Sequence, residues 1–242
     1  MLYNVFMLKN ILFDMDGTLI GCSVEEFLKP YYAAIVKKFA GRRDAKQIAD
    51  TVLKGAVPMI ENDGSRTNRE AFFAFAEGRT DMTAEEFESS MTEFYNNEYS
   101  VVADVINPKP LIVDAVDILR KKGYRLVVTT NPLFPLVALE SRLKWGGYDP
   151  SVFEFVTSYE TSRYAKPSVG YYTEVLERLG MDPSESMIVG NDRHEDIETG
   201  KAAGMKTYWL TDTPIDNCAA EPDEKGRSKD FLAFVNALPS LS

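Results

Sequence analysis

The sequence predicts an α/β protein, with a parallel sheet covered by helices on both faces and a separate helical domain. Two observations support this prediction. Beyond residue 111, short apolar runs alternate with longer amphipathic stretches, a pattern typical of right-handed β-α-β units. Between residues 21 and 104 the apolar positions recur with helical spacing, and no convincing strand occurs. We therefore expect a core domain formed by residues 1–20 and 105–242, and a helical domain formed by residues 21–104.

The first strand is predicted at residues 10–13, where the run Asn-Ile-Leu-Phe is followed by Asp14, Asp16 and a glycine. An apolar run this short indicates a buried strand whose carboxyl end carries polar side chains. The helical domain is predicted from a further helix at residues 44–53 and from three capping boxes, in which a Ser or Thr precedes a Glu by three positions: Ser23 with Glu26, Thr67 with Glu70, and Thr83 with Glu86. Gly21, Cys22 and residues 104–110 are the expected hinges between the two domains.

In the second half of the chain, strands and helices alternate after the stiff segment Asn-Pro-Lys-Pro at residues 107–110. Strands are expected at residues 125–129, 153–157, 187–189 and 206–210. Helices are expected at residues 111–122, 133–145, 168–179, 195–203 and 230–238. Because ligands of such sheets bind beyond the carboxyl ends of the strands, the polar residues at those ends are the candidate site.

The composition excludes several classes of function. The 242 residues include 27 Lys and Arg against 37 Asp and Glu, and the net charge of −10 argues against binding to nucleic acid or to an anionic membrane. No apolar run approaches the ~18 residues of a membrane span, and the first six residues are too short and polar for a secretory signal. Cys22 and Cys218 are far apart, which indicates free thiols in a reducing compartment. A cytoplasmic location is expected.

Eight polar residues lie at or near the predicted strand ends: Asp14, Asp16, Thr130, Asn131, Lys166, Asn191, Asp192 and Asp196. Gathered carboxylates repel one another unless a hard divalent cation lies among them, and Mg²⁺ suits carboxylates together with a substrate phosphate. A lysine and a hydroxyl would then bind anionic oxygens, as phosphoryl transfer requires. Asp14 is placed to attack phosphorus, and Asp16 to protonate the leaving oxygen and later deprotonate water.

These residues also have ordinary structural explanations. A calcium loop starting at Asp14 is excluded, because its sixth position must be glycine and is Leu19. Asp192 and Asp196 can instead cap the following helix, whose N-terminal dipole favours acidic side chains. His194, the only histidine, is expected to be exposed and without a catalytic role. Most aromatic residues of the helical domain are expected to fill its interior: Tyr31, Tyr32, Phe39, Phe72, Phe73, Phe75, Phe87, Phe94 and Tyr95.

Four segments together resemble, in order, the four motifs of the haloacid dehalogenase-like hydrolase superfamily. The first is Asp-Met-Asp-Gly-Thr at residues 14–18, and the second is Val-Val-Thr-Thr-Asn at residues 127–131. The third is Ala-Lys-Pro at residues 165–167, and the fourth is Ile-Val-Gly-Asn-Asp at residues 188–192 with Asp196. The resemblance extends over residues 7–211.

The resemblance implies a Rossmann-like core, a helical cap domain inserted after the first motif, dependence on Mg²⁺ and a phosphoaspartyl intermediate. Asp14 would be the nucleophile and a metal ligand, and Asp16 the acid and base whose backbone carbonyl also binds the metal. Thr130, Asn131 and Lys166 would bind the transferring phosphoryl group.

The fourth motif leaves two alignments open, because many relatives carry an acidic residue directly after its glycine and this chain has Asn191 there. Either Asn191 or Asp192 is the metal ligand. Asp192 is favoured, since it restores a carboxylate at the metal, which leaves Asn191 and Asp196 in outer positions.

The predicted function is hydrolysis of a small phosphorylated metabolite, a phosphoric monoester, by a monomer or homodimer. Asp16 argues against a dehalogenase, because a halide needs no proton when it leaves, whereas an alkoxide leaving phosphorus does. The alternatives are a sugar phosphomutase of the same superfamily and a catalytically silent binding module on the same fold. The silent module predicts loss of a catalytic position, yet Asp14, Asp16, Thr130 and Lys166 are all present.

Overall fold

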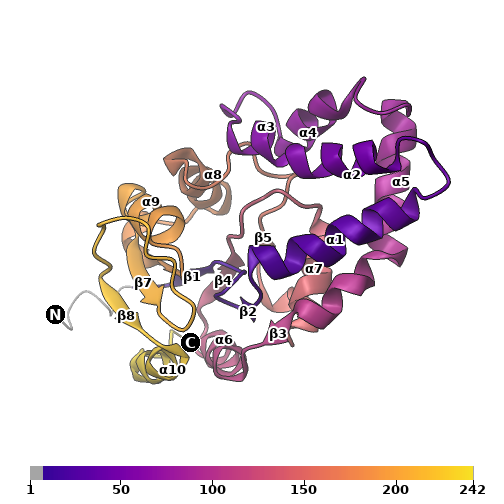
Figure 1. The fold of residues 1–242 in the computed structure, drawn as a ribbon. Coiled ribbons are helices and arrows are strands. Elements are labelled where there is room, and N and C mark those ends of the chain that lie inside the picture. Colours follow the sequence, from indigo (N-terminus) through magenta and orange to yellow (C-terminus); the bar gives the residue numbers. More distant parts are fainter. Residues whose placement is uncertain (1–7, 242) are drawn as a thin grey trace.

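A computed structural model describes residues 8–241 and has a six-stranded sheet at its centre (Figure 1). The strand order is β5-β4-β1-β6-β7-β8, and all five neighbouring pairs are parallel. The strands are β1 (Asn10–Phe13), β4 (Arg125–Val128), β5 (Phe155–Val156), β6 (Ser186–Gly190), β7 (Lys206–Leu210) and β8 (Glu224–Gly226). The predicted parallel α/β fold is confirmed. Residues 1–6, which were predicted to belong to the core domain, lie outside the described residues.

Helices cover both faces of the sheet, as predicted. Helices α6 (Pro110–Lys121) and α10 (Ser228–Ala237) lie on one face, and α8 (Val169–Leu179) and α9 (Thr199–Ala202) on the other (Figure 1). Along β1 the side chains alternate accordingly: Ile11 and Phe13 belong to the apolar cluster of α6 and α10, whereas Leu12 packs with α8. Apolar side chains are therefore buried on both faces of the sheet, and the polar candidate residues lie at its carboxyl edge.

The segment between β1 and α6 is helical, and all three predicted capping boxes form at its helix N-termini. Its helices gather on one side of the sheet (Figure 1): α1 (Val24–Lys38), α2 (Ala45–Lys54), α3 (Ala56–Ile60), α4 (Asn68–Ala76), α5 (Ala84–Asn97) and the 3₁₀ helix η2 (Tyr99–Val105). Where the chain enters and leaves this segment, the short strands β2 (Ile20–Gly21) and β3 (Asn107–Pro108) pair antiparallel. The division into two domains and the hinges stay predictions.

Three differences from the predicted elements have physical reasons. Helix α7 (Leu136–Trp145) begins later than residue 133 because Pro135 disfavours the helical conformation of the residue before it. The edge strand β8 is polar, so apolar patterning did not reveal it. The predicted helix at residues 195–203 is a π-helix, η5 (Arg193–Glu198), followed by α9.

The remaining short elements are the 3₁₀ helices η3 (Pro150–Val152) and η4 (Pro183–Glu185). Across residues 8–241, no helix combines the length and the apolar character needed to cross a membrane.

Candidate active site

Seven of the eight predicted site residues line one cavity of about 950 Å³ at the carboxyl edge of the sheet. They follow β1, β4 and β6, which are neighbours in the sheet: Asp14, Asp16, Thr130, Asn131, Asn191, Asp192 and Asp196. The eighth, Lys166, comes from the loop between β5 and α8 and contacts two of them. The structure thus brings together residues that are up to 182 positions apart (Asp14 to Asp196, 196 − 14).

Lys166 joins the first and fourth motifs. Its ammonium nitrogen lies 2.9 Å from Oδ1 of Asp14 and 2.6 Å from Oδ1 of Asp196, and its side chain is completely buried. Burial alone would lower the pKa of Lys166, but the two carboxylates outweigh it and raise that pKa well above its usual value. The lysine is therefore a permanent cation beside Asp14.

Asp196 reaches this position because β6 ends in a glycine. A Cβ atom on Gly190 would lie 2.1 Å from Oδ2 of Asp196, so no other residue fits there without displacing the carboxylate. The same oxygen accepts a hydrogen bond of 3.1 Å from the amide of Asp192, and Oδ1 accepts one of 3.3 Å from the hydroxyl of Tyr172. Asp196 is held from three directions.

Asp16 pairs with a cation that sequence reasoning missed. Arg142 of α7 donates from Nη2 to Oδ1 of Asp16, and its guanidinium lies over the ring of Phe27 with 4.7 Å to the ring centroid. Only 3% of the Arg142 side chain is exposed, against 32% for Asp16, which faces the cavity. Burial raises the pKa of Asp16, Arg142 opposes that shift, and the charge of Asp14 adds to it. In the sequence, Arg142 is one basic residue of an amphipathic helix, and no local signal marks it.

The turn after Asp14 is fixed from three sides. Gly17 has a φ of 79°, a conformation that favours glycine, and its carbonyl accepts hydrogen bonds of 2.7 Å from Lys109 Nζ and 3.0 Å from Thr213 Oγ1. The amide nitrogen of Asn191 lies 2.4 Å from the place of a Cβ on Gly17. Lys109 and Thr213 were not predicted as site residues, because they act through the backbone of the turn.

Thr130 and Asn131 stand at the end of β4. The carbonyl of Thr130 accepts hydrogen bonds of 2.9 Å from Thr157 Oγ1 and 2.7 Å from the hydroxyl of Tyr171, which fix the backbone at this point. Asn131 donates to the carbonyl of Lys166 at 3.5 Å, and its own side-chain oxygen is buried without a hydrogen-bond partner. An unpaired buried acceptor is costly and can be satisfied by a ligand or by water.

The two fourth-motif candidates have different surroundings. Oδ1 of Asp192 accepts hydrogen bonds from the amides of His194 and Glu195 at 2.8 and 2.9 Å, so Asp192 caps η5. The side chain of Asn217 donates to both carboxylate oxygens. Asn191 is buried instead; its Nδ2 donates to the carbonyl of Thr213 at 2.8 Å, and its Oδ1 accepts from Thr18 at 3.3 Å.

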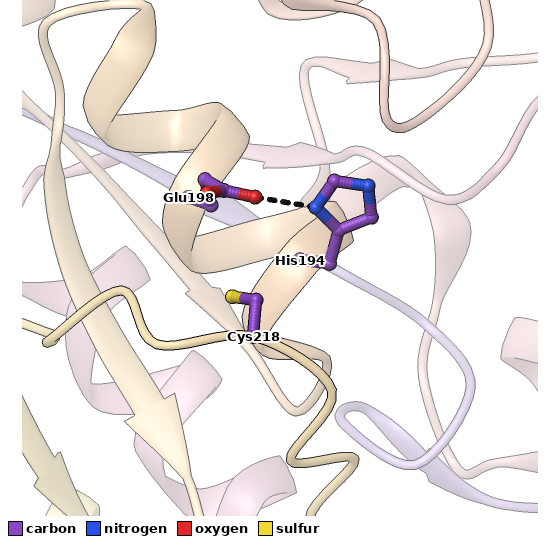
Figure 2. Close-up of side chains that lie close together, drawn as sticks. All are labelled: His194, Glu198 and Cys218. Atoms are coloured by element: carbon purple, nitrogen blue, oxygen red, sulfur yellow. Dashed lines mark hydrogen bonds and ion pairs between the residues drawn. The ribbon is translucent and has the colours of Figure 1, made fainter.

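His194 is exposed, as expected, and is not among the residues lining the cavity. Figure 2 shows it facing Glu198 on the same helix, with Cys218 approaching from a separate loop. Among the residues that the structure describes, this is the only group of three His, Cys, Asp or Glu side chains whose ligand atoms all lie within 4.8 Å of one another. An exposed contact of this kind contributes little to stability.

The cavity edge fits a hard divalent cation. Five carboxylates line it, those of Asp14, Asp16, Asp192, Glu195 and Asp196, whereas three cations lie at this edge, those of Lys166, Arg142 and Lys109. Glu195 was not predicted; burial raises its pKa, Lys166 opposes that shift, and the charges of Asp14 and Asp192 add to it. An excess of oxygen ligands and negative charge is what Mg²⁺ and similar cations require.

The chain is similar to known hydrolases in sequence and in fold. Residues 8–204 match the family model of haloacid dehalogenase-like hydrolases. The chain is 29% identical over 213 residues to a phosphoglycolate phosphatase of Aquifex aeolicus, with 83% of each chain covered. It is 27% identical over 216 residues to the pyrophosphatase PpaX of Bacillus velezensis, with 88% of this chain and 89% of that one covered. Among solved structures, it shares the fold of a HAD phosphatase from Thermococcus onnurineus, with a TM-score of 0.63, 19% identity, and 97% and 100% of the two chains covered.

Proposed function

The chain belongs to the haloacid dehalogenase-like hydrolase family, and within it we propose a Mg²⁺-dependent phosphoric monoester hydrolase that works through an aspartyl phosphate. The observation that supports this most is the buried Lys166, which bridges Asp14 and Asp196 beside a second, cavity-facing carboxylate, Asp16. A nucleophile and an acid then line one end of one cavity, and a buried cation contacts the nucleophile.

In the first step, the Asp14 oxygen that does not contact Lys166 attacks phosphorus, and the bond to the ester oxygen breaks. Asp16 gives its proton to that oxygen, so the product alcohol leaves neutral. In the second step, Asp16 takes a proton from water, whose oxygen attacks the phosphorus of the aspartyl phosphate. Phosphate leaves and Asp14 is restored. The pKa of Asp16, raised by burial, suits a group that must both give and take a proton.

Lys166, Thr130 and Asn131 are proposed to bind the phosphoryl oxygens. Lys166 contributes charge without any rearrangement, since its position is already fixed by two carboxylates. Asn131 and Thr130 stand on a strand end whose backbone is tied by Thr157 and Tyr171.

Mg²⁺ would be held by the carboxylate of Asp14, the backbone carbonyl of Asp16 and a side-chain oxygen of the fourth motif. When bound, it would offset the repulsion between the phosphoryl oxygens and Asp14. For the fourth motif, we propose Asn191 rather than Asp192. Asn191 packs directly against the turn of Asp14 to Gly17, whereas an oxygen of Asp192 is already committed to capping η5.

The test is release of phosphate from p-nitrophenyl phosphate by the wild-type protein and by Asp14→Asn, each with Mg²⁺ and with EDTA. We expect release only by the wild type with Mg²⁺. Equal rates for the two proteins would instead support the silent binding module. Turnover that needs a bisphosphate sugar primer would support the phosphomutase.

A further inference from the structure

We propose that the alcohol part of the substrate is large and apolar, so that the physiological substrate is the phosphate ester of an aromatic or long aliphatic alcohol. This inference rests on the proposed phosphatase function and specifies its substrate class. It comes from the part of the cavity that lies away from the carboxylates, inside the helical segment formed by α1 to α5.

The cavity runs from the catalytic edge deep between these helices, and its lining there is almost entirely apolar. Each of the five helices contributes to it: Phe27, Leu28, Tyr31, Val52, Leu53, Ala56, Met59, Phe72, Phe73, Met91 and Tyr95. Some of the aromatic residues that were expected to fill this interior therefore line an open space. Protein interiors are normally packed as densely as organic crystals, and an unfilled apolar space costs stability. A volume of about 950 Å³ is in the range of pockets that enclose an organic ligand of considerable size.

The charges of the lining argue against an anionic alcohol part. Among the described residues of the helical segment, the one charged side chain that lines the cavity is Glu26, which is acidic. The one cation of the lining is Arg142, and it is already paired with Asp16. A carboxylate such as that of phosphoglycolate, or the second phosphate of pyrophosphate, would enter this space without a counter-charge, at a high desolvation cost.

The polar groups of the lining argue against a sugar. Ser23 and Glu26 bind each other in the capping box of α1, with 2.8 Å between Ser23 Oγ and Glu26 Oε2. The hydroxyls of Tyr31 and Tyr95 lie 2.6 Å apart and pair with each other. A sugar carries several hydroxyls that must each find a partner when buried, and this lining offers few. An apolar group needs none.

The experiment compares kcat/KM of the wild-type protein, with saturating Mg²⁺, for methyl, butyl and octyl phosphate and for phosphoglycolate, pyrophosphate and glucose 6-phosphate. We expect kcat/KM to rise about 3- to 4-fold per added methylene until the cavity is filled. Octyl phosphate should exceed all three polar substrates. A flat profile with chain length, or a preference for any polar substrate, would overturn the proposal.

A variant that fills the apolar end of the cavity tests whether the alcohol part of the substrate binds there. Ala56→Phe places a ring in the cavity from α3, whereas Ala33→Phe places the same ring on the exposed face of α1. We expect Ala56→Phe to lower kcat/KM for octyl phosphate at least tenfold and to leave methyl phosphate nearly unchanged, and Ala33→Phe to leave both unchanged. An equal loss on both substrates in Ala56→Phe would contradict the placement of the alcohol part. If that variant does not fold, the wild-type chain-length profile still decides.

Different results would contradict the proposed function and this inference. If no ester releases phosphate in a manner that depends on Asp14, the phosphatase itself is wrong. If phosphoglycolate or pyrophosphate is hydrolysed best and Asp14→Asn is inactive, the phosphatase stands and the apolar substrate is wrong.

Discussion

The ammonium nitrogen of Lys166 lies 2.9 Å from Asp14 and 2.6 Å from Asp196, so one buried cation serves two carboxylates. In the proposed mechanism this arrangement gives Lys166 two functions that are hard to separate. It holds the Asp14 carboxylate in place, and it offers a fixed positive charge to the group that Asp14 attacks.

We predict that Lys166→Met lowers kcat for phosphate release by about 10²- to 10³-fold, the usual loss when one preorganised donor to a developing charge is removed. Lys166→Arg should restore little, because a planar guanidinium does not fit the space of a compact ammonium that is completely buried. Steady-state kinetics at saturating Mg²⁺ measure the effect, and circular dichroism controls for folding. A loss below tenfold in folded Lys166→Met would contradict this role.

Removing Asp16 and removing Arg142 should lower the free energy of unfolding by different amounts. Asp16→Asn leaves a guanidinium that is only 3% exposed without its counter-charge, which should lower the free energy of unfolding by about 3–5 kcal/mol. Arg142→Met leaves Asp16, which is 32% exposed and can be hydrated from the cavity, so a loss of about 1–3 kcal/mol is expected. Urea unfolding of both variants measures the difference. The double variant should be more stable than Asp16→Asn alone; if it is less stable, the pair does not behave as a buried ion pair.

The sequence predicted the sheet and most of the site because both follow from local patterns. Asp14, Thr130 and Asn191 stand directly after or close to apolar strands, and the parallel sheet brings its strand ends together. Lys166 was found through its motif, since a lysine in a loop carries no signal of its own.

The parts that were not predicted depend on tertiary contacts. Arg142 differs from a surface arginine only through its contacts with Phe27 and Asp16, which are distant in the sequence. The π-helix that begins at Arg193 contains a single apolar residue, Ile197, so apolar periodicity could not distinguish it from an ordinary helix. The open space among the helix aromatics is likewise a property of packing, which no spacing rule describes.

The choice between Asn191 and Asp192 is testable by metal activation. We expect Asn191→Ala to raise the Mg²⁺ concentration for half-maximal activity by about 10- to 100-fold, as losses at a metal site typically do. Asp192→Asn should leave that concentration unchanged, because asparagine caps a helix as well as aspartate. Activity titrations with Mg²⁺ at saturating substrate compare the two. The reverse result would assign the metal to Asp192.

The capping boxes predict a loss of stability in acid. The hydroxyl and amide of Ser23 lower the pKa of Glu26 below its usual 4.5, and the amide of Thr83 does the same for Glu86. Because the folded protein holds these protons more weakly than the unfolded chain, the stabilisation is complete above about pH 5 and disappears as the pH falls through the lowered pKa. The double variant Glu26→Gln/Glu86→Gln should therefore melt at a lower temperature than the wild type at pH 6, and the difference should vanish near pH 3.

The matched control is Glu25→Gln/Glu85→Gln, which changes the same charge one position earlier in the same helices. Glu25 and Glu85 feel the same helix dipole, but the cap residues hydrogen-bond to Glu26 and Glu86. The control should thus show a smaller pH-dependent shift in melting temperature between pH 6 and pH 3, measured by calorimetry. Equal shifts in the two variants would assign the acid sensitivity to the helix dipoles rather than to the capping hydrogen bonds.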